Sequence, residues 1–324
     1  MPLFWKNAMQ TLFTKNKKQI LLITFCMFLL FLNACKHEQT EDIYILYTND
    51  IAGEVYGEVG YSGVKGYKDY LQSEHPYVGL VDAGDFFDGS FSVSDKGAAI
   101  VQIMNAVGYE AAALGNQEFW IGLDALANNI KESDFPYLSC NLKYEGSGED
   151  LLKDVKPYVI KQYGWTKIAY IGVTTPETMT PGKPSYEAIT ENGEFIYSFY
   201  EGNDGADLYE QVQKTIDKVR KKVDYVIVLA HLGSNSVTEG FSSYDLIDNT
   251  TGIDVVIDGH SHTPISGEGV YDAGGNNVVL TSTGEKLQNL GVLIIHPDHT
   301  FNTALYPSVY EKNSAIDELI ASLR

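Results

Sequence analysis

The chain has 324 residues, of which 44% are hydrophobic and 12% aromatic, and it carries 43 acidic against 23 basic side chains. This length and apolar content are sufficient for a packed core and exclude a disordered protein. The formal net charge of −20 excludes nucleic acid as a general partner.

The N-terminal segment has the pattern of a secretory signal. Residues 1–34 contain four lysines and no acid, and the apolar run Ile20–Leu32 leads into the tetrad Leu-Asn-Ala-Cys that ends at Cys35. This tetrad resembles the lipobox of bacterial lipoproteins, whose cysteine is lipidated and becomes the mature N-terminus. A plain membrane anchor is the alternative, but the run is shorter than the roughly 20 residues that a span needs. We therefore expect a signal peptide over 1–34, a tether over 35–42, and an extracytoplasmic protein anchored to the bacterial membrane by lipid at Cys35.

Removal of that segment makes the chain more acidic. Without its four lysines, 19 basic residues face 43 acidic ones, and the formal net charge becomes −24. An anionic substrate then needs metal ions or a local basic cluster to overcome the repulsion. Beyond Cys35 only Cys140 remains, so no internal disulfide forms, and we expect Cys140 to be a small buried apolar residue.

From residue 43 onward, apolar strand patterns alternate with amphipathic helix patterns. Strands are expected at 43–48, 77–83, 111–114, 168–173, 225–230, 255–258, 277–282 and 291–296, and helices at 97–107, 122–131 and 207–222. No repeat or low-complexity linker interrupts this order. The sequence therefore predicts one domain over 43–311, followed by a C-terminal helix or tail over 312–324.

Metal-ligand side chains follow these strands. They are Asp50, Asp85, Asn116, His231, His260 and His262, and each lies beside a turn-forming residue. Because ligands of open α/β sheets bind at the carboxyl ends of the strands, we expect all six at one sheet edge. Each has an ordinary alternative, as a turn former, a cap or a core histidine, but six in ordered positions favour a metal site. Two carboxylates, one amide and three imidazoles suit a pair of divalent first-row ions.

The segments around these residues resemble the calcineurin-like metallophosphoesterases, and more closely the bacterial 5′-nucleotidase and UDP-sugar hydrolase family. The segments are YTNDIAGEV, DAGDFFDGS, LGNQEF, LAHLG and DGHSHT, with VTTPET and TGEKLQNLG similar to further parts of the family. The resemblance implies an α/β fold, a four-layer α/β/β/α sandwich, with two divalent ions chosen from Zn, Mn, Co and Mg. It also implies that Asp85 bridges the ions. Asn116, His231 and His260 complete one site, while Asp50 and His262 serve the other.

Three positions depart from the family pattern. Ala52 stands where the family has a metal-binding histidine, so we expect one tight site and one weak site unless Glu54 or water fills in. Gln117 stands in the position of the catalytic histidine, and Trp120 in that of its aspartate partner. Gln117 donates hydrogen bonds but cannot give up a proton, and general acid catalysis is worth roughly 10²- to 10⁴-fold, or about 3–5 kcal/mol.

Two functions remain open on the sequence. The first is an exported, metal-dependent phosphoester hydrolase of the 5′-nucleotidase type, which acts on nucleotides or related phosphoesters with reduced or shifted activity. The second is a non-catalytic lipoprotein that binds metal or phosphate on the same scaffold. The chain ends at Arg324, soon after the expected domain. The resemblance then implies that a nucleobase-binding domain is missing or comes from a separate chain.

Overall fold

The computed structural model describes residues 39–87, 95–235, 238 and 240–323. Thr40–Arg324 form one compact unit. The expected signal segment and Cys35 lie outside the described residues. Within the described part, no helix combines the length and apolar character needed to cross a membrane.

The first sheet has six strands, four of them parallel. Its order is β16 (Phe301–Tyr306), β15 (Leu290–Ile295), β1 (Ile43–Thr48), β2 (Val78–Asp82), β3 (Ala111–Ala113) and β4 (Tyr137–Leu138). Strands β1 to β4 are mutually parallel, whereas β15 and β16 pair antiparallel. The parallel part places the ends of β1, β2 and β3 at one edge.

The second sheet repeats this plan. Its order is β13 (Pro264–Tyr271), β14 (Asn277–Thr283), β12 (Val255–Asp258), β11 (Tyr225–His231), β7 (Thr166–Thr174) and β6 (Tyr158–Tyr163). The four central strands are parallel, and both edge strands are antiparallel. Two short pairs lie outside the sheets, β5 (Leu142–Tyr144) with β10 (Tyr197–Phe199) and β8 (Thr190–Glu191) with β9 (Glu194–Phe195).

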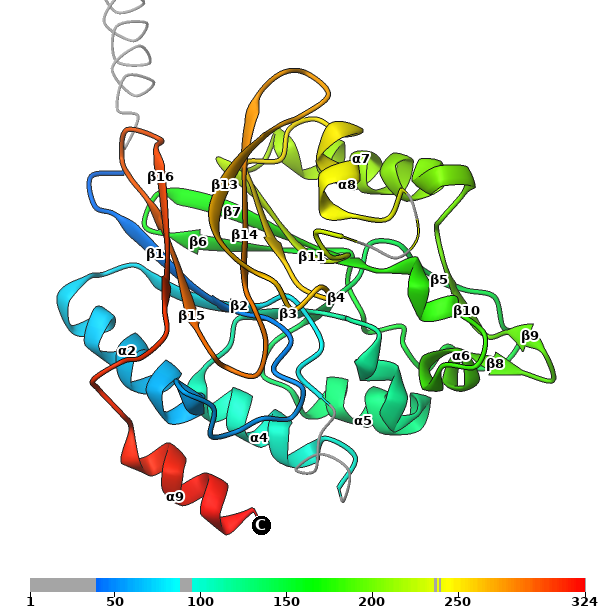
Figure 1. Ribbon diagram of the computed structural model, residues 1–324, viewed down its shortest axis with the longest axis horizontal. Coiled ribbons are helices and arrows are strands. Elements are labelled where there is room, and N and C mark those ends of the chain that lie inside the picture. The colour runs from blue at the N-terminus through cyan, green and yellow to red at the C-terminus, as the bar shows by residue number, and fades with distance from the viewer. Residues whose placement is uncertain (1–38, 88–94, 236–237, 239, 324) are drawn as a thin grey trace, which may run out of the picture. The chain divides into compact units, whose positions relative to one another are not determined.

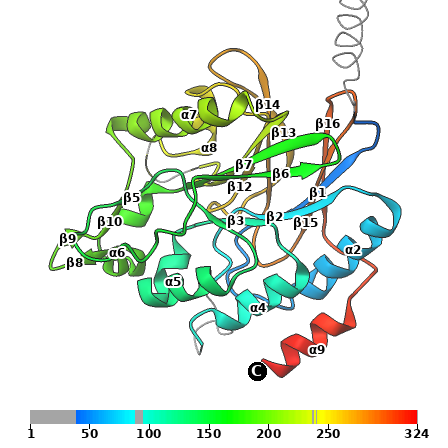
Figure 2. The same ribbon diagram turned by 180° about the vertical axis from the view of Figure 1, so that it is seen from behind.

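Helices cover the outer face of each sheet, which gives four layers (Figures 1 and 2). The first sheet is covered by α2 (Gly60–Glu74), α4 (Ala98–Val107) and α5 (Leu123–Glu132), and α9 (Ser314–Ser322) packs against α2 and α4. The second is covered by α7 (Ala206–Arg220) and α8 (Ser243–Asp248). The chain also forms α6 (Pro184–Ile189) and the 3₁₀ segments η1 (Gln117–Ile121), η2 (Pro176–Met179) and η3 (Asn203–Gly205). The four-layer α/β/β/α sandwich is confirmed.

Three apolar cores hold the layers together. Along β1, Ile45 and Tyr47 face the core between the sheets, while Leu46 faces the helices. Along β11, Leu229 likewise faces the core between the sheets, while Val228 faces the helices. Alternate side chains of a strand point to opposite faces, so both faces of a central strand must be apolar here. The near-continuous apolar runs of the sequence follow from this.

The expected strands and helices are present, with only small shifts at their ends. The sequence analysis missed α2, β6, α6, α8, β13 and β16 among the larger elements. In α2 the cause is visible, because Gly63 and Gly66 interrupt the helix pattern. A Cβ at Gly66 would lie 2.3 Å from the carbonyl oxygen of Glu311, so glycine there lets the segment before α9 cross the helix closely.

Candidate metal centre

Loops from both sheets meet at one edge, and their backbone atoms are joined directly. The amide of Asp50 donates to the carbonyl of Gly84 at 2.9 Å, which links the loops after β1 and β2. The amide of His260, after β12 in the other sheet, donates to both carboxylate oxygens of Asp50 at 3.0 and 2.9 Å. The parallel strands of the two sheets therefore deliver their following residues to a common place.

Asp85, His231 and His260 form a compact ligand group there, with one ligand atom of each within 4.8 Å of the others. His231 is fully buried, and its Nε2 lies 3.0 Å from Asp85 Oδ2. Its Nδ1 lies 2.9 Å from the carbonyl oxygen of Ala83. A carbonyl oxygen only accepts, so Nδ1 carries a proton, and Nε2 is the ring atom that can bind an ion once its own proton has left.

Two buried polar atoms have no hydrogen-bond partner among the described residues, Asn116 Oδ1 and His231 Nε2, whose 3.0 Å contact with Asp85 Oδ2 is close but does not meet hydrogen-bond geometry. Such atoms normally find a partner, because burying them unpaired costs about 1–3 kcal/mol. The absence of a side chain at Gly115 lets the Asp85 carboxylate lie against the loop after β3, since a Cβ at Gly115 would lie 2.1 Å from Asp85 Oδ1. Carboxylate, amide oxygen and imidazole nitrogen are ligands of divalent first-row ions, so the residues present fit a metal ion.

Asp50 and His262 lie beside this group. Asp50 Oδ1 is 3.9 Å from His231 Nε2 and 3.5 Å from His262 Nε2. The other ring nitrogen of His262 lies 3.3 Å from Glu285 Oε2. Ala52 offers no ligand atom here. Glu54 Oε1 accepts hydrogen bonds from the amides of Tyr56 and Gly57 at 2.8 and 3.2 Å. This carboxylate is therefore engaged within its own loop.

Four of the six expected ligands hold a left-handed backbone. The φ angles are 50° at Asp50, 59° at Asp85, 75° at His260 and 54° at His262. Non-glycine residues there cost of order 1–3 kcal/mol each and persist only where the surrounding structure imposes them. Such strain concentrates at functional sites, which makes this edge of the sheets the candidate site independently of ligand chemistry.

Two of the three positions expected to depart from the family pattern, Gln117 and Trp120, lie on η1, which starts directly after Asn116. The amide of Gln117 donates to Asp85 Oδ1 at 2.8 Å, and the Gln117 side chain is buried with an unpartnered Oε1 among the described residues. Trp120 is 38% exposed. Residues three apart eclipse one another in a 3₁₀ helix, so Gln117 and Trp120 share one face of η1. A neutral amide and an indole thus stand where the resemblance implies a histidine and an aspartate.

The sequence analysis missed Glu118, which is fully buried on η1. Its Oε2 accepts from the amides of Asp85 and Gly115 at 2.9 and 2.7 Å, and its Oε1 accepts from those of Phe86 and Phe87 at 2.9 and 3.2 Å. Glu118 therefore joins the loop after β2 to the loop after β3. Burial, with the nearby Asp85 carboxylate, raises the pKa of Glu118 to about 7. The presence of an acid in the segment LGNQEF was the only sequence signal.

Glu177 is the second residue missed, although its segment VTTPET stood out in the sequence. Its Oε2 lies 3.1 Å from His260 Nε2, and its Oε1 accepts from the amide of Thr238 at 2.9 Å. The hydrogen bond from His260 holds the pKa of Glu177 at about 2, against the effect of partial burial. Glu177 thus faces a ligand of the group without belonging to it.

Electrostatics favour a cation at the group. Burial disfavours the charged form of His231, but the carboxylates of Asp85 and Asp50 prevail and raise its pKa to about 10. His231 in turn holds the pKa of Asp85 below its usual range although burial opposes this. A proton therefore competes with a metal ion for His231 Nε2, and metal binding releases it.

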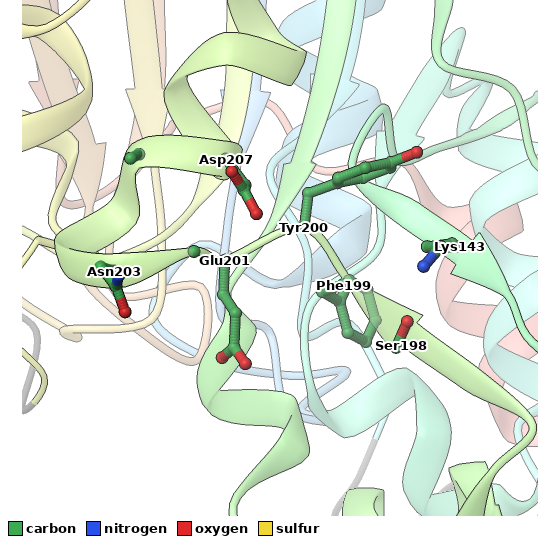
Figure 3. Close-up of a pocket in the computed structure, with 9 residues that line it drawn as sticks. Lys143, Ser198, Phe199, Tyr200, Glu201, Asn203 and Asp207 are labelled. Carbon is green, nitrogen blue, oxygen red and sulfur yellow. The ribbon is translucent and has the colours of Figure 1, made fainter.

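A hollow of about 580 Å³ near β10 and α7 lies apart from the ligand group (Figure 3). Its lining includes Lys143, Tyr200, Glu201 and Asp207, but none of the six expected ligands. Lys143 already pairs with Glu145 at 2.6 Å. The described lining of this hollow therefore offers no free cation for a phosphate. The group of Asp85, His231 and His260 remains the candidate site.

Comparison with known proteins places the domain. Residues 73–289 match the family described as bacterial capsule synthesis protein PGA_cap. The snake venom 5′-nucleotidase of Gloydius brevicauda is 32% identical over 239 residues, which cover 68% of this chain and 37% of that protein. The trifunctional nucleotide phosphoesterase YfkN of Bacillus subtilis is 31% identical over 218 residues, or 59% of this chain and 14% of that protein. The chain thus spans well under half of these relatives.

Two solved structures have the same fold. A 5′-nucleotidase precursor from Thermus thermophilus superposes with a TM-score of 0.71 at 22% identity, covering 87% of this chain and 58% of that one. The calcineurin-like phosphoesterase YfkN from Bacillus subtilis superposes with a TM-score of 0.67 at 24% identity, covering 88% and 97%. The expected resemblance to calcineurin-like 5′-nucleotidase domains is confirmed.

Proposed function

The chain belongs to the family described as bacterial capsule synthesis protein PGA_cap, its domain is of the calcineurin-like 5′-nucleotidase type, and from this premise we propose that it is a metal-dependent phosphoester hydrolase. The observation that carries the proposal is the largely buried group of Asp85, His231 and His260, whose ligand atoms lie close enough together to hold one divalent ion. Nucleotides or related phosphoesters are the proposed substrates, because the relatives are named for nucleotide hydrolysis.

The proposed ligand sets are unequal. Asp85, Asn116, His231 and His260 hold one ion tightly. Asp50, Asp85 and His262 hold a second ion weakly, because Ala52 supplies nothing and Glu54 is occupied by backbone amides. Zn, Mn, Co and Mg are the proposed ions. When bound, they supply Lewis-acid polarisation of the phosphoryl group and lower the pKa of the attacking water.

The remaining chemistry belongs to the chain itself. If Asn116 held the ion through Oδ1, its Nδ2 hydrogens would be left to donate to a phosphoryl oxygen, and Gln117 would donate from Nε2 in the same way. These donors orient the phosphorus for in-line attack. Gln117 carries no transferable proton, so the leaving oxygen departs without a proton from this residue.

Reconstitution tests the proposal. The full chain is stripped with EDTA, reloaded with Mn²⁺ or Zn²⁺, and assayed on aryl phosphates, nucleotides and UDP-sugars, with Asp85→Asn as the blank. We expect metal-dependent hydrolysis that the blank lacks. Metal analysis should give about one tightly held ion per chain and a second only in excess metal. Two equally tight ions would contradict the unequal ligand sets.

A non-catalytic lipoprotein that binds metal or phosphate is the second candidate, and the loss of an acid at Gln117 and Trp120 favours it. The same assay separates the two candidates. Bound metal with no hydrolysis of any substrate, aryl esters included, establishes the non-catalytic function.

Export with a lipid anchor at Cys35, and a separate chain that contributes nucleobase contacts, complete the proposal. The chain spans 37% of the length of the venom enzyme. If the isolated chain cleaves AMP with a KM in the ordinary range of about 1 μM to 1 mM, no separate chain is required.

A further inference from the structure

We propose that Glu177 is a positioning residue of the metal centre, which fixes the tautomer and orientation of His260 so that Nδ1 becomes its metal-binding atom. The inference rests on the proposed metal site and deepens it. Glu177 itself is not a ligand.

The contact geometry supports this role. Glu177 Oε2 lies 3.1 Å from His260 Nε2, and both side chains are mostly shielded, at 13% and 21% exposure. A glutamate carboxylate is ionised at neutral pH and only accepts hydrogen bonds. The hydrogen must therefore sit on His260 Nε2. The neutral ring then has one lone pair left, at Nδ1, for an ion.

The position of Glu177 is itself fixed by the fold. β7 ends at Thr174, and Thr175 caps η2 by accepting a hydrogen bond from the Glu177 amide at 3.2 Å. Thr178 closes the turn with a hydrogen bond from its hydroxyl to the Thr175 carbonyl at 2.7 Å. A short capped turn at the end of a central strand holds the carboxylate with little freedom, which is what orienting a ligand requires.

The second carboxylate oxygen of Glu177 contacts a different loop, the one between β11 and α8. Glu177 Oε1 accepts from the amide of Thr238, which lies between β11 and α8. One side chain thus joins η2, the loop that follows His231, and the loop that carries His260. A carboxylate that orients a metal-binding histidine also raises the basicity of the ring, and loss of such a partner typically weakens metal binding about 10- to 100-fold.

Calorimetric titration of the metal-free full chain with Zn²⁺ tests the role without relying on catalysis. We expect Glu177→Gln to weaken the tight site about 10-fold or more, and to change the absorption spectrum of the Co²⁺-loaded protein. The matched control is Glu201→Gln, which removes the same charge from the same groove of about 290 Å³ beside η2. The control should retain wild-type affinity and spectrum.

The melting temperature of each metal-free variant separates positioning from folding, and it should stay near the wild-type value. If Glu177→Gln fails to fold, Glu177→Asp keeps the charge but withdraws it from the ring, and should also weaken Zn²⁺ binding. Wild-type affinity and spectrum in Glu177→Gln, or equal losses in both glutamine variants, overturn the inference. If the wild type binds no Zn²⁺, the inference and the proposed function both fail. If it binds Zn²⁺ but hydrolyses nothing, only the proposed hydrolase fails.

Discussion

Asp85 shows how many partners a single site residue serves. Its amide donates to Glu118 at 2.9 Å, its Oδ1 accepts from the amide of Gln117 at 2.8 Å, and its Oδ2 lies 3.0 Å from His231 Nε2. These contacts hold the residue at a φ of 59°. Because its backbone and one carboxylate oxygen are fixed, the other oxygen is aimed at the ligand group in advance. Asp85→Asn keeps the shape of the side chain and removes its charge, so it is a suitable inactive control for the reconstitution assay.

The amide side chain of Gln117 predicts which substrates the protein hydrolyses efficiently. The ribose 5′-oxygen of a nucleoside monophosphate needs a proton as its bond to phosphorus breaks, whereas p-nitrophenolate or the phosphate end of a split pyrophosphate needs far less help. We expect the wild type to prefer aryl phosphates and pyrophosphates strongly over AMP. Restoring Gln117→His together with Trp120→Asp should raise kcat/KM for AMP by one or more orders of magnitude, since a general acid contributes about 10²- to 10⁴-fold.

The measurement is kcat/KM for AMP and for p-nitrophenyl phosphate in excess Mn²⁺, with Gln162→His on the edge strand β6 as a control. Trp120 is partly exposed, so its replacement opens no sealed cavity. If the wild type cleaves AMP as fast as the aryl ester, another group acts as the acid and Gln117 is not the limiting residue.

At the scale of elements, the short 3₁₀ segment η1 carries several residues of the candidate site. It begins directly after Asn116, presents Gln117 and Trp120 on one face, and buries Glu118 between the loops after β2 and β3. A 3₁₀ helix of five residues has poor internal hydrogen bonding, so its conformation depends on outside partners. Glu118 supplies four of those contacts.

Glu118→Ala should therefore destabilise the fold severely. It leaves four buried amides without their acceptor, and even partial rescue by water leaves an expected loss of about 3–5 kcal/mol in the free energy of unfolding. Glu118→Gln keeps one acceptor oxygen and should lose about 1–3 kcal/mol. Urea denaturation measures both, with Glu132→Ala at the exposed end of α5 as the control. A loss under about 1 kcal/mol for Glu118→Ala would show that the loops hold their shape without this carboxylate.

At the scale of the whole molecule, the two sheets and three cores make a rigid frame, and the site lies where loops of both sheets meet. Only a sandwich of two parallel-centred sheets brings the loops after β1 and β12, far apart in sequence, into direct contact through Asp50 and the amide of His260. The formal net charge of −20 gives the molecule an overall negative potential that repels phosphate. Bound metal ions would offset this repulsion and attract an anionic substrate.

Attachment to a membrane is the prediction at this scale. The N-terminal pattern of lysines, apolar run and lipobox-like tetrad predicts that Cys35→Ser blocks processing and lipid labelling, while Cys26→Ser, inside the apolar run, does not. Metabolic labelling with a radioactive fatty acid, followed by membrane fractionation, gives the result. Labelling that persists in Cys35→Ser rules the anchor out.

The sequence by itself determined the order and type of the central elements. Strands β1, β2, β7, β11 and β12 are largely apolar runs that stop at turn-forming residues, because both of their faces are buried, and such runs are legible without any tertiary knowledge. The candidate ligands were legible for the same reason, since each follows one of the central strands. Helix α2 was not, because its glycines serve a close contact with residues 309–312 rather than a turn.

Only the tertiary structure decided how the ligands are supported. Glu118 and Glu177 lie in segments that the sequence singles out, but their roles could not be assigned there, because those roles depend on the amides and the ring that the fold brings to each carboxylate. The left-handed backbones at Asp50, Asp85, His260 and His262 are likewise imposed by the meeting of loops from two sheets. Local sequence encodes which residues end a strand, but the strain, the hydrogen-bond partners and the distances of the site arise between segments that meet only after the sandwich has closed.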